Sequence, residues 1–170
     1  MIAADDFERA ELGTAWGRIR GYTLPVLAQG MAVSRSGVAG AYRIGACGPD
    51  QFSQGEFGFA PHSGLRVRQD SDKGSAYYGI AGLDGDRYYA GLVKVIGREN
   101  HQLAETFPAT VQPHVRLEIR GSVLRLLHGP TVEGPWEELV TDTDETLKVG
   151  SPGFAVWGGG SVAQWRGGDL

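Results

Sequence analysis

The chain has 170 residues, of which 41% are hydrophobic and 27 are glycine. This length can supply one complete hydrophobic core, so we expect a single domain over residues 1–170. The net charge is −4 at pH 7. Nucleic acid and anionic membrane surfaces are excluded as expected partners, because binding to either needs a basic surface. No window approaches the roughly 18 to 20 apolar residues of a membrane-spanning helix.

Two features of the sequence bear on the cellular compartment. Cys47 is the single cysteine, so no intramolecular disulfide can form. The opening MIAADDFERAEL carries aspartates where a secretion signal has a basic residue and an apolar run. We therefore expect a chain without an export signal.

Short strands separated by turns are predicted along the whole chain. Apolar residues alternate with polar ones, or run between glycines, over 64–68, 75–82, 87–96, 154–157 and 161–165. The segments 75–82 and 87–96 are joined by a turn with Asp84-Gly85 at its centre. No segment keeps a period near 3.6 over three turns, which argues against long helices.

The strongest local signal is an antiparallel hairpin over 114–133. Apolar and charged residues alternate from Val115 to Arg120, the period of two that marks a strand with one buried face. Gly121-Ser122 can take the positive φ of a tight turn, and the apolar pattern then resumes. About a dozen such strands with frequent turns predict an all-β sandwich or barrel.

The order of short motifs along the chain resembles one known family. The motifs are DDF-x-R at 5–9, LG at 12–13, Trp16, GLRVR at 64–68, YY at 77–78 and 88–89, VRLEIRG at 115–121, SPGF at 151–154 and W-x-GGD at 165–169. Together they are similar to concanavalin A-like lectin/glucanase jelly rolls, and the likeness covers nearly the whole chain.

The resemblance implies a jelly-roll sandwich of two large antiparallel sheets, one concave, with the first and last strands side by side. Proteins of this fold include lectins, polysaccharide hydrolases and lyases, and many non-catalytic modules. The most similar subset occurs in phage virion proteins and in bacterial surface or secreted proteins. The missing export signal and disulfides favour the phage alternative.

Catalysis by paired carboxylates is the first functional hypothesis. A retaining glycosidase needs two carboxyls about 5 to 5.5 Å apart, and glucanases of this fold place them on one strand. The nearest acidic cluster, Asp142-x-Asp144-Glu145, falls in a predicted polar loop, and Glu137-Glu138 would face opposite ways on a strand. These acids are interpreted as solvated charges. Lyase chemistry, which uses a Tyr and a His, finds no matching motif.

No cofactor is expected, although a structural calcium is an open alternative. Several relatives hold calcium near the paired termini, which makes Asp5, Asp6 and Asp169 the candidate ligands by resemblance. Aspartates also favour turns because they hydrogen-bond to their own backbone, so the same residues have a purely structural interpretation.

Carbohydrate binding is the remaining site hypothesis. Sugars stack on aromatic rings, and the pairs Tyr77-Tyr78 and Tyr88-Tyr89 lie on adjacent predicted strands, where each pair has one ring per face. The second tyrosine of each pair shares a face with aliphatic residues. We therefore predict Tyr77 and Tyr88 as the exposed rings, with Trp136 as a loop aromatic. The alternative is that Tyr is simply a favoured strand residue.

The sequence thus predicts a non-catalytic structural or adhesion module of a phage virion, in a tail, spike or capsid appendage. Its expected partners are other virion or surface proteins, within an oligomer or larger assembly, and host-surface glycans. An extracellular or cell-surface position within a longer protein is the alternative location. A polysaccharide-cleaving enzyme that uses the concave sheet is the alternative function.

Overall fold

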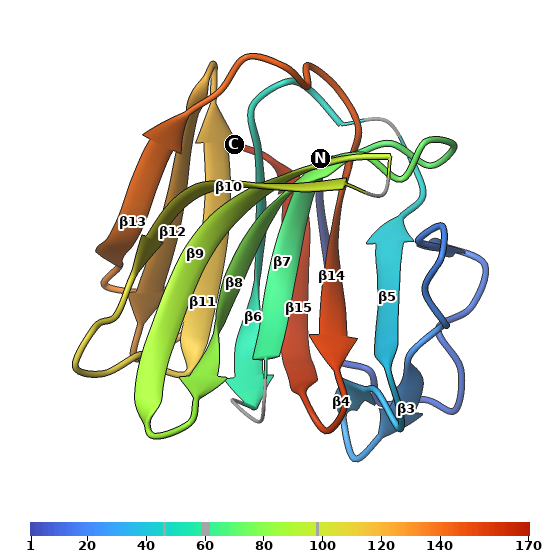
Figure 1. Cartoon of the computed structure of the whole chain (residues 1–170). Helices are drawn as coiled ribbons and strands as arrows, with labels where there is room; N and C mark the ends of the chain where they lie inside the picture. Colours follow the sequence, from blue (N-terminus) through green and yellow to red (C-terminus); the bar gives the residue numbers. More distant parts are fainter. Residues whose placement is uncertain (46, 59–61, 98) are drawn as a thin grey trace.

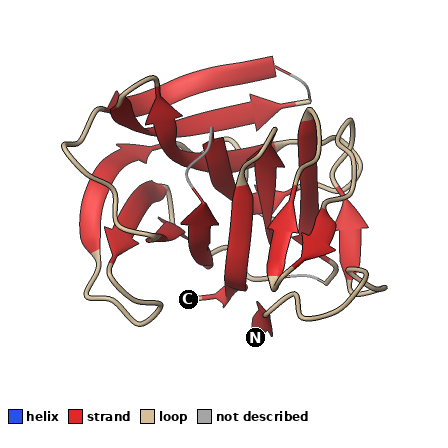
Figure 2. Cartoon of the chain, turned by 90° about the horizontal axis from the view of Figure 1, so that it is seen from below, coloured by secondary structure: helices blue, strands red, loops and turns tan. Residues whose placement is uncertain are grey.

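The molecule is built from two stacked antiparallel β-sheets joined by turns. A computed structural model of the chain describes residues 1–45, 47–58, 62–97 and 99–170. Within these residues there are strands and turns and no α-helix (Figure 2). It follows that no described helix could cross a bilayer.

Sheet A has eight strands in the order β13-β12-β11-β6-β15-β4-β3, and β1 pairs with part of β15. Its strands are β1 (Ile2–Asp5), β3 (Val26–Ala28), β4 (Met31–Val33), β6 (Gln51–Gly58), β11 (His114–Arg120), β12 (Val123–Gly129), β13 (Glu137–Thr143) and β15 (Ser161–Asp169).

Sheet B has seven strands in the order β10-β9-β8-β7-β14-β5-β2. Its strands are β2 (Trp16–Arg18), β5 (Val38–Arg43), β7 (His62–Gln69), β8 (Ala76–Asp84), β9 (Arg87–Ile96), β10 (Glu99–Thr106) and β14 (Ser151–Trp157). Figure 1 shows β5, β14, β7, β8 and β9 side by side in this sheet.

Two predictions about strand pairing are confirmed. The hairpin forms as β11 and β12, with Leu117 opposite Leu126 and with Gly121 at φ 57° in the turn. The first and last strands lie side by side, because β1 pairs with β15. The two termini are close together (Figure 1), and the N-terminal ammonium binds the carboxylate of Asp169.

The core between the sheets is centred on a cluster of aromatic rings. The Trp16 ring centroid lies 4.7 Å from that of Trp165 and 5.3 Å from that of Phe154, and both contacts are edge-to-face. Phe7 packs on Phe154 at 5.5 Å. Edge-to-face pairs add to the large apolar area that each ring buries, so these residues join β2, β14 and β15 firmly.

The outer face of sheet B also buries apolar side chains. Tyr78, Val93, Val95 and Ala155 form a second cluster there, with the half-buried Tyr22 and Trp157 packed on it among others. Tyr78 is directly opposite Val93, and Val95 is two residues further along β9. Ala155 is opposite Gly64, which is opposite Ile80 on β8, so all four side chains share a face. Sheet B is thus covered on both faces, unlike a sheet with one solvated face.

Glycine at position 153 is required by a close approach of two strands. A Cβ built there would lie 2.5 Å from the carbonyl oxygen of Ala41 and 2.8 Å from the Cα of Tyr42. We expect Gly153→Ala to force β14 away from β5 and to lower the free energy of unfolding by about 1 to 3 kcal/mol. Chemical denaturation measures this change.

Gly158→Ala is the matched control, because a Cβ at Gly158 meets no atom within 4 Å. Its effect is expected to stay within about 0.5 kcal/mol. Equal effects of the two substitutions would contradict the close packing of β14 against β5.

Candidate functional site

A hollow on the outer face of sheet B brings together aromatic rings and cationic side chains. Its volume is about 480 Å³. It lies between the segment 19–22 and the sheet, and we call it the outer hollow. It is lined by Ile19, Arg20, Gly21, Tyr22, Val38, Arg66, Gly74, Val95, Gly97, Asn100 and Trp157.

The segment 19–22 can lie on the sheet because residue 40 has no side chain. A Cβ at Gly40 would come 2.9 Å from Ile19 Cδ1 and 3.0 Å from Tyr22 Cδ2. The amide of Tyr22 donates to the carbonyl of Ile19 at 3.0 Å, which closes a turn. Ile19 is 1% exposed. This burial fixes one wall of the outer hollow.

Arg66 on β7 forms the base of the outer hollow and is 1% exposed. Its Cζ lies 4.9 Å from the ring centroid of Tyr22 and 4.8 Å from that of Tyr78. Nη1 donates to Gln69 Oε1 at 2.6 Å, and Nη2 donates to the Tyr22 hydroxyl at 2.8 Å. The contacts with the two rings and these two bonds hold the guanidinium in one orientation.

Two polar atoms of this region are buried without a hydrogen-bond partner. They are Nε of Arg66 and the hydroxyl of Tyr78. Burial raises the pKa of the Tyr78 hydroxyl well above 10, so it stays protonated and can donate. Trp157 covers the Tyr78 ring at a centroid distance of 5.3 Å. Buried polar atoms usually have partners, so two orphans in one region are unusual.

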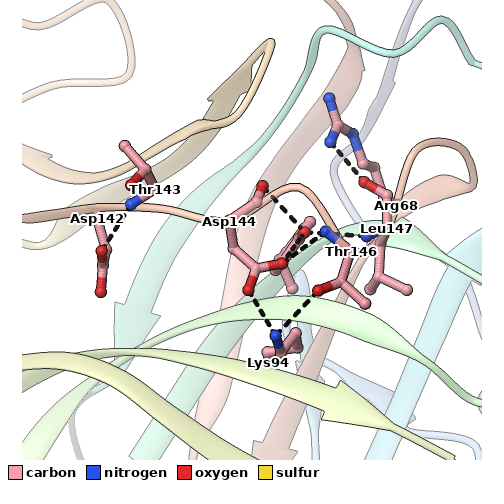
Figure 3. Close-up of polar contacts among 8 residues, drawn as sticks. Arg68, Lys94, Asp142, Thr143, Asp144, Thr146 and Leu147 are labelled. Atoms are coloured by element: carbon pink, nitrogen blue, oxygen red, sulfur yellow. Dashed lines mark hydrogen bonds and ion pairs between the residues drawn. The ribbon is translucent and has the colours of Figure 1, made fainter.

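A separate polar cluster surrounds Asp144 on the loop between β13 and β14 (Figure 3). Asp144 Oδ1 accepts from the Tyr77 hydroxyl at 2.5 Å and from the Thr146 amide at 2.8 Å, and Oδ2 accepts from Lys94 Nζ. Burial would raise the pKa of Asp144, but the bonds from Lys94 and Tyr77 outweigh it and hold the pKa well below 3.8. Burial and the bond to Asp144 raise the pKa of Tyr77 to about 12.

Comparisons with known proteins agree on the architecture. No family model matches the sequence, and no curated protein matches it. Among solved structures, the carbohydrate-binding module CBM66 of Bacillus subtilis aligns at TM-score 0.66 and 18% identity over 89% of this chain and 92% of that one. The exoplasmic/lumenal domain of VIP36, in its metal-free form, aligns at 0.69 and 11% identity, covering 98% and 91%. The CBM2 module of the evolved Dit of Lactobacillus casei BL23 phage J-1 aligns at 0.59 and 12%, covering 97% and 94%.

The chain has the concanavalin A-like lectin/glucanase fold. The resemblance seen in its sequence motifs is therefore confirmed, and so is the two-sheet architecture.

Tyr77 does not face solvent in this lectin-like sandwich, and the prediction of an exposed ring is wrong. Tyr77 is 0% exposed and belongs to the core between the sheets. The prediction assumed that aliphatic neighbours mark the core-facing side of β8. They do not, because the outer face of sheet B buries aliphatic residues too.

Tyr88 also points toward the space between the sheets. It is half-buried and packs against the same core cluster as Tyr77, so the expectation of an exposed ring is wrong here as well. Tyr89, its neighbour, lies on the opposite face, with its ring 5.7 Å from Phe107 and 6.3 Å from His62.

Trp136 lies on the other side of the molecule, over sheet A. It lines a smaller hollow of about 310 Å³ with Phe52, Gln54 and Arg116. The polar groups here have partners of their own: Arg116 Nε donates to Glu118 at 2.6 Å and Nη1 to Gln54 at 2.5 Å. Carbohydrate binding by Trp136 stays a prediction.

The calcium candidates do not meet at one site. Asp5 is paired with Trp165, whereas Asp169 is four residues further along β15, about 13 Å away at the rise of a strand. Asp5 accepts from Arg9 and from Trp16 Nε1, and Asp6 Oδ1 accepts the Glu8 amide at 3.1 Å. Among the described residues, no group of three or more His, Cys, Asp and Glu side chains could hold a metal ion.

The acidic residues of the catalytic hypothesis have structural partners. Glu138 accepts from Arg125 at 2.7 Å, and Glu137 Oε2 lies 3.6 Å from His128 Nε2. Asp144 is not the solvated loop charge that was expected, because Lys94 and Tyr77 hold it. Its ion pair with Lys94 serves to fix the β13–β14 loop to sheet B.

Tyr22, Arg66 and Trp157 were not predicted from the sequence. Arg66 sits in the alternating GLRVR segment, where a charged residue normally marks a solvated face. Tyr22 lies outside any strand, and its position depends on a contact with Gly40. A local sequence pattern cannot indicate contacts between residues that lie this far apart in the sequence.

Asp144→Asn tests the cluster in Figure 3. We expect the free energy of unfolding at pH 7 to fall by roughly 1 to 3 kcal/mol, since the half-buried Lys94 and the buried Tyr77 lose an ionised partner. Because the pKa of Asp144 is lower in the folded than in the unfolded chain, its stabilisation is present above about pH 4 and lost on further acidification. The difference between wild type and variant should therefore shrink below pH 4 in denaturation series.

Glu145→Gln is the control for that series. The Glu145 carboxylate is exposed, and its ion pair with Lys148 Nζ, at 3.7 Å, joins two exposed side chains. This substitution should change stability by less than about 0.5 kcal/mol. An Asp144→Asn effect that does not vary with pH would contradict the role of the ionised carboxylate.

Proposed function

We propose that this chain is a non-catalytic carbohydrate-binding module and that the outer hollow holds the glycan. The observation that carries the proposal is the convergence of two half-buried aromatic rings, Tyr22 and Trp157, with the donors of Arg20, Arg66 and Asn100 in one hollow. Small-molecule sites are typically concave and apolar, with a few polar groups that fix orientation.

The chemistry of the outer hollow suits a sugar ring. The aromatic side chains offer faces for the C–H bonds of a pyranose, and the amide and guanidinium groups offer hydrogen-bond donors to its oxygens. Arg66 is held by contacts with two rings and by its bonds to Gln69 and Tyr22 before any ligand arrives. A pre-positioned donor reduces the ordering cost of binding.

A binding role fits the described acids better than hydrolysis does. No Asp or Glu of the described residues lines the outer hollow, and glycosidases need two carboxyls flanking the bond that is cleaved. Two of the similar structures, CBM66 and the CBM2 module of the phage J-1 Dit, are carbohydrate-binding modules by name.

If the outer hollow binds the glycan, substitutions of its lining residues should lower the affinity. A glycan array should identify a ligand, and Trp157→Ala and Asn100→Ala should each weaken its binding in calorimetry, the first by about tenfold or more. Trp136→Ala, on the opposite sheet, is the matched control and should leave the affinity unchanged. Circular dichroism of each variant checks that the fold is retained.

The same experiment separates the alternatives. Loss of binding in Trp136→Ala alone would move the site to the hollow over sheet A. Turnover of a polysaccharide panel at catalytic protein concentrations, followed by reducing ends and by absorbance of unsaturated sugars, would overturn the non-catalytic proposal in favour of a polysaccharide-cleaving enzyme.

We further propose that the module belongs to a phage virion, where it would contact other virion proteins. The support is the fold shared with the module of the phage J-1 Dit. Many weak glycan sites on one particle would give high avidity. Antibodies against the chain should label purified particles in electron microscopy, and the absence of label on denatured as well as intact particles would contradict this location.

A further inference from the structure

The charge of Arg66 has no carboxylate to balance it. It is 1% exposed, and no described Asp or Glu forms an ion pair with it. Arginine stays protonated in proteins, so the cation is buried. The nearby rings of Tyr22 and Tyr78 offset part of the cost of burial, but an unpaired buried charge remains unfavourable.

The nearest acids in the sequence are engaged elsewhere. Asp70 Oδ1 accepts the amides of Asp72 and Lys73 at 2.8 Å each, and Asp72 Oδ1 accepts the Ser71 hydroxyl at 3.1 Å. These bonds stay within the turn between β7 and β8. They leave the guanidinium with neutral acceptors, the Gln69 amide and the Tyr22 hydroxyl.

Arg66 has a donor that no described residue accepts from. A guanidinium has five N–H donors. Those given to Gln69 and Tyr22 account for two of them, and Nε has no partner. The rings of Tyr22 and Tyr78 lie close to the group, and Arg66 lines the outer hollow, so a further partner would reach it from the hollow. An edge with free N–H groups matches a carboxylate, which guanidinium binds in a bidentate manner.

A second cation lies on the same hollow. Arg20 is exposed, and its Nη1 donates to a backbone carbonyl, that of Asp72, at 2.9 Å. The outer hollow therefore carries two positive charges and no described carboxylate, in a chain whose net charge is −4. The hollow is thus a local positive site on a negative protein, and it favours anions.

We propose that the outer hollow selects acidic glycans, those whose sugar ring carries a carboxylate, with the carboxylate at Arg66 and Arg20 and the ring against Trp157. This inference rests on the proposed glycan-binding function and specifies its ligand class. The carboxylate would pair a buried charge that is otherwise unpaired, which a neutral sugar cannot do. A site built for an ionic partner discriminates strongly against a ligand that lacks it.

Matched polymers test the ligand class. Polygalacturonate, alginate and hyaluronate are compared with the same polymers after reduction of their carboxyls to alcohols, by calorimetry or affinity electrophoresis. We expect at least one acidic polymer to bind about tenfold or more tightly than its reduced counterpart, and we expect this preference to weaken as salt is added. Dextran sulfate is included as a polyanion without carboxylates.

Variants assign the preference to the outer hollow. Arg66→Gln should abolish the ratio between acidic and reduced polymer. Arg20→Gln, at an exposed position where folding is not at risk, should lower the same ratio several-fold. Arg125→Gln removes the same charge from the outer face of sheet A, where Arg125 pairs with the exposed Glu138. This control should leave the ratio unchanged.

The outcomes are distinct. Equal binding of acidic and reduced polymers overturns the acidic ligand class and leaves the proposed glycan-binding function standing. Failure to bind any glycan overturns the proposed function itself. Dextran sulfate binding as tightly as the uronates, or an equal loss in Arg125→Gln, overturns carboxylate recognition in favour of a general charge effect.

Discussion

Sheet B buries apolar side chains on both faces, and the rest of the molecule depends on this constraint. Its inner face supplies Tyr77, Leu92 and Phe154 to the core, and its outer face carries Tyr78, Val93 and Val95. The outer set must be shielded from water, and segment 19–22 with Trp157 provides that cover. The outer hollow is the space left between this cover and the sheet.

Glycines on sheet B make the cover possible. Gly40 leaves room for Ile19 and Tyr22, and Gly64 leaves room for the Tyr78 ring, which a Cβ there would meet at 2.5 Å. The close approach of the Tyr78 ring to β7 places it beside Arg66, whose Cζ lies 4.8 Å from the ring centroid. The guanidinium is then enclosed by the packing of its neighbours, without an ion pair to hold it.

The two polar clusters of sheet B differ in whether their charged group has an oppositely charged partner within the fold. Asp144 has Lys94, Tyr77 and Thr146 as partners, so its charge is balanced inside the fold and it fixes a loop. Arg66 has only neutral partners, so its charge is not balanced inside the fold. A satisfied cluster stabilises the native state, whereas an unsatisfied one marks a place where binding can add free energy.

The sequence by itself determined the strand pattern, the hairpin at 114–133 and the family likeness, because period-two alternation and turn residues are local properties. It also determined that each tyrosine pair would split between two faces. Only the tertiary structure decided which face of sheet B packs against sheet A. Both faces carry aliphatic residues, so the alternation does not show which one points into the core between the sheets. The same holds for Arg66: its pattern predicts exposure, and its burial results from Tyr22, a residue 44 positions earlier that packs over it.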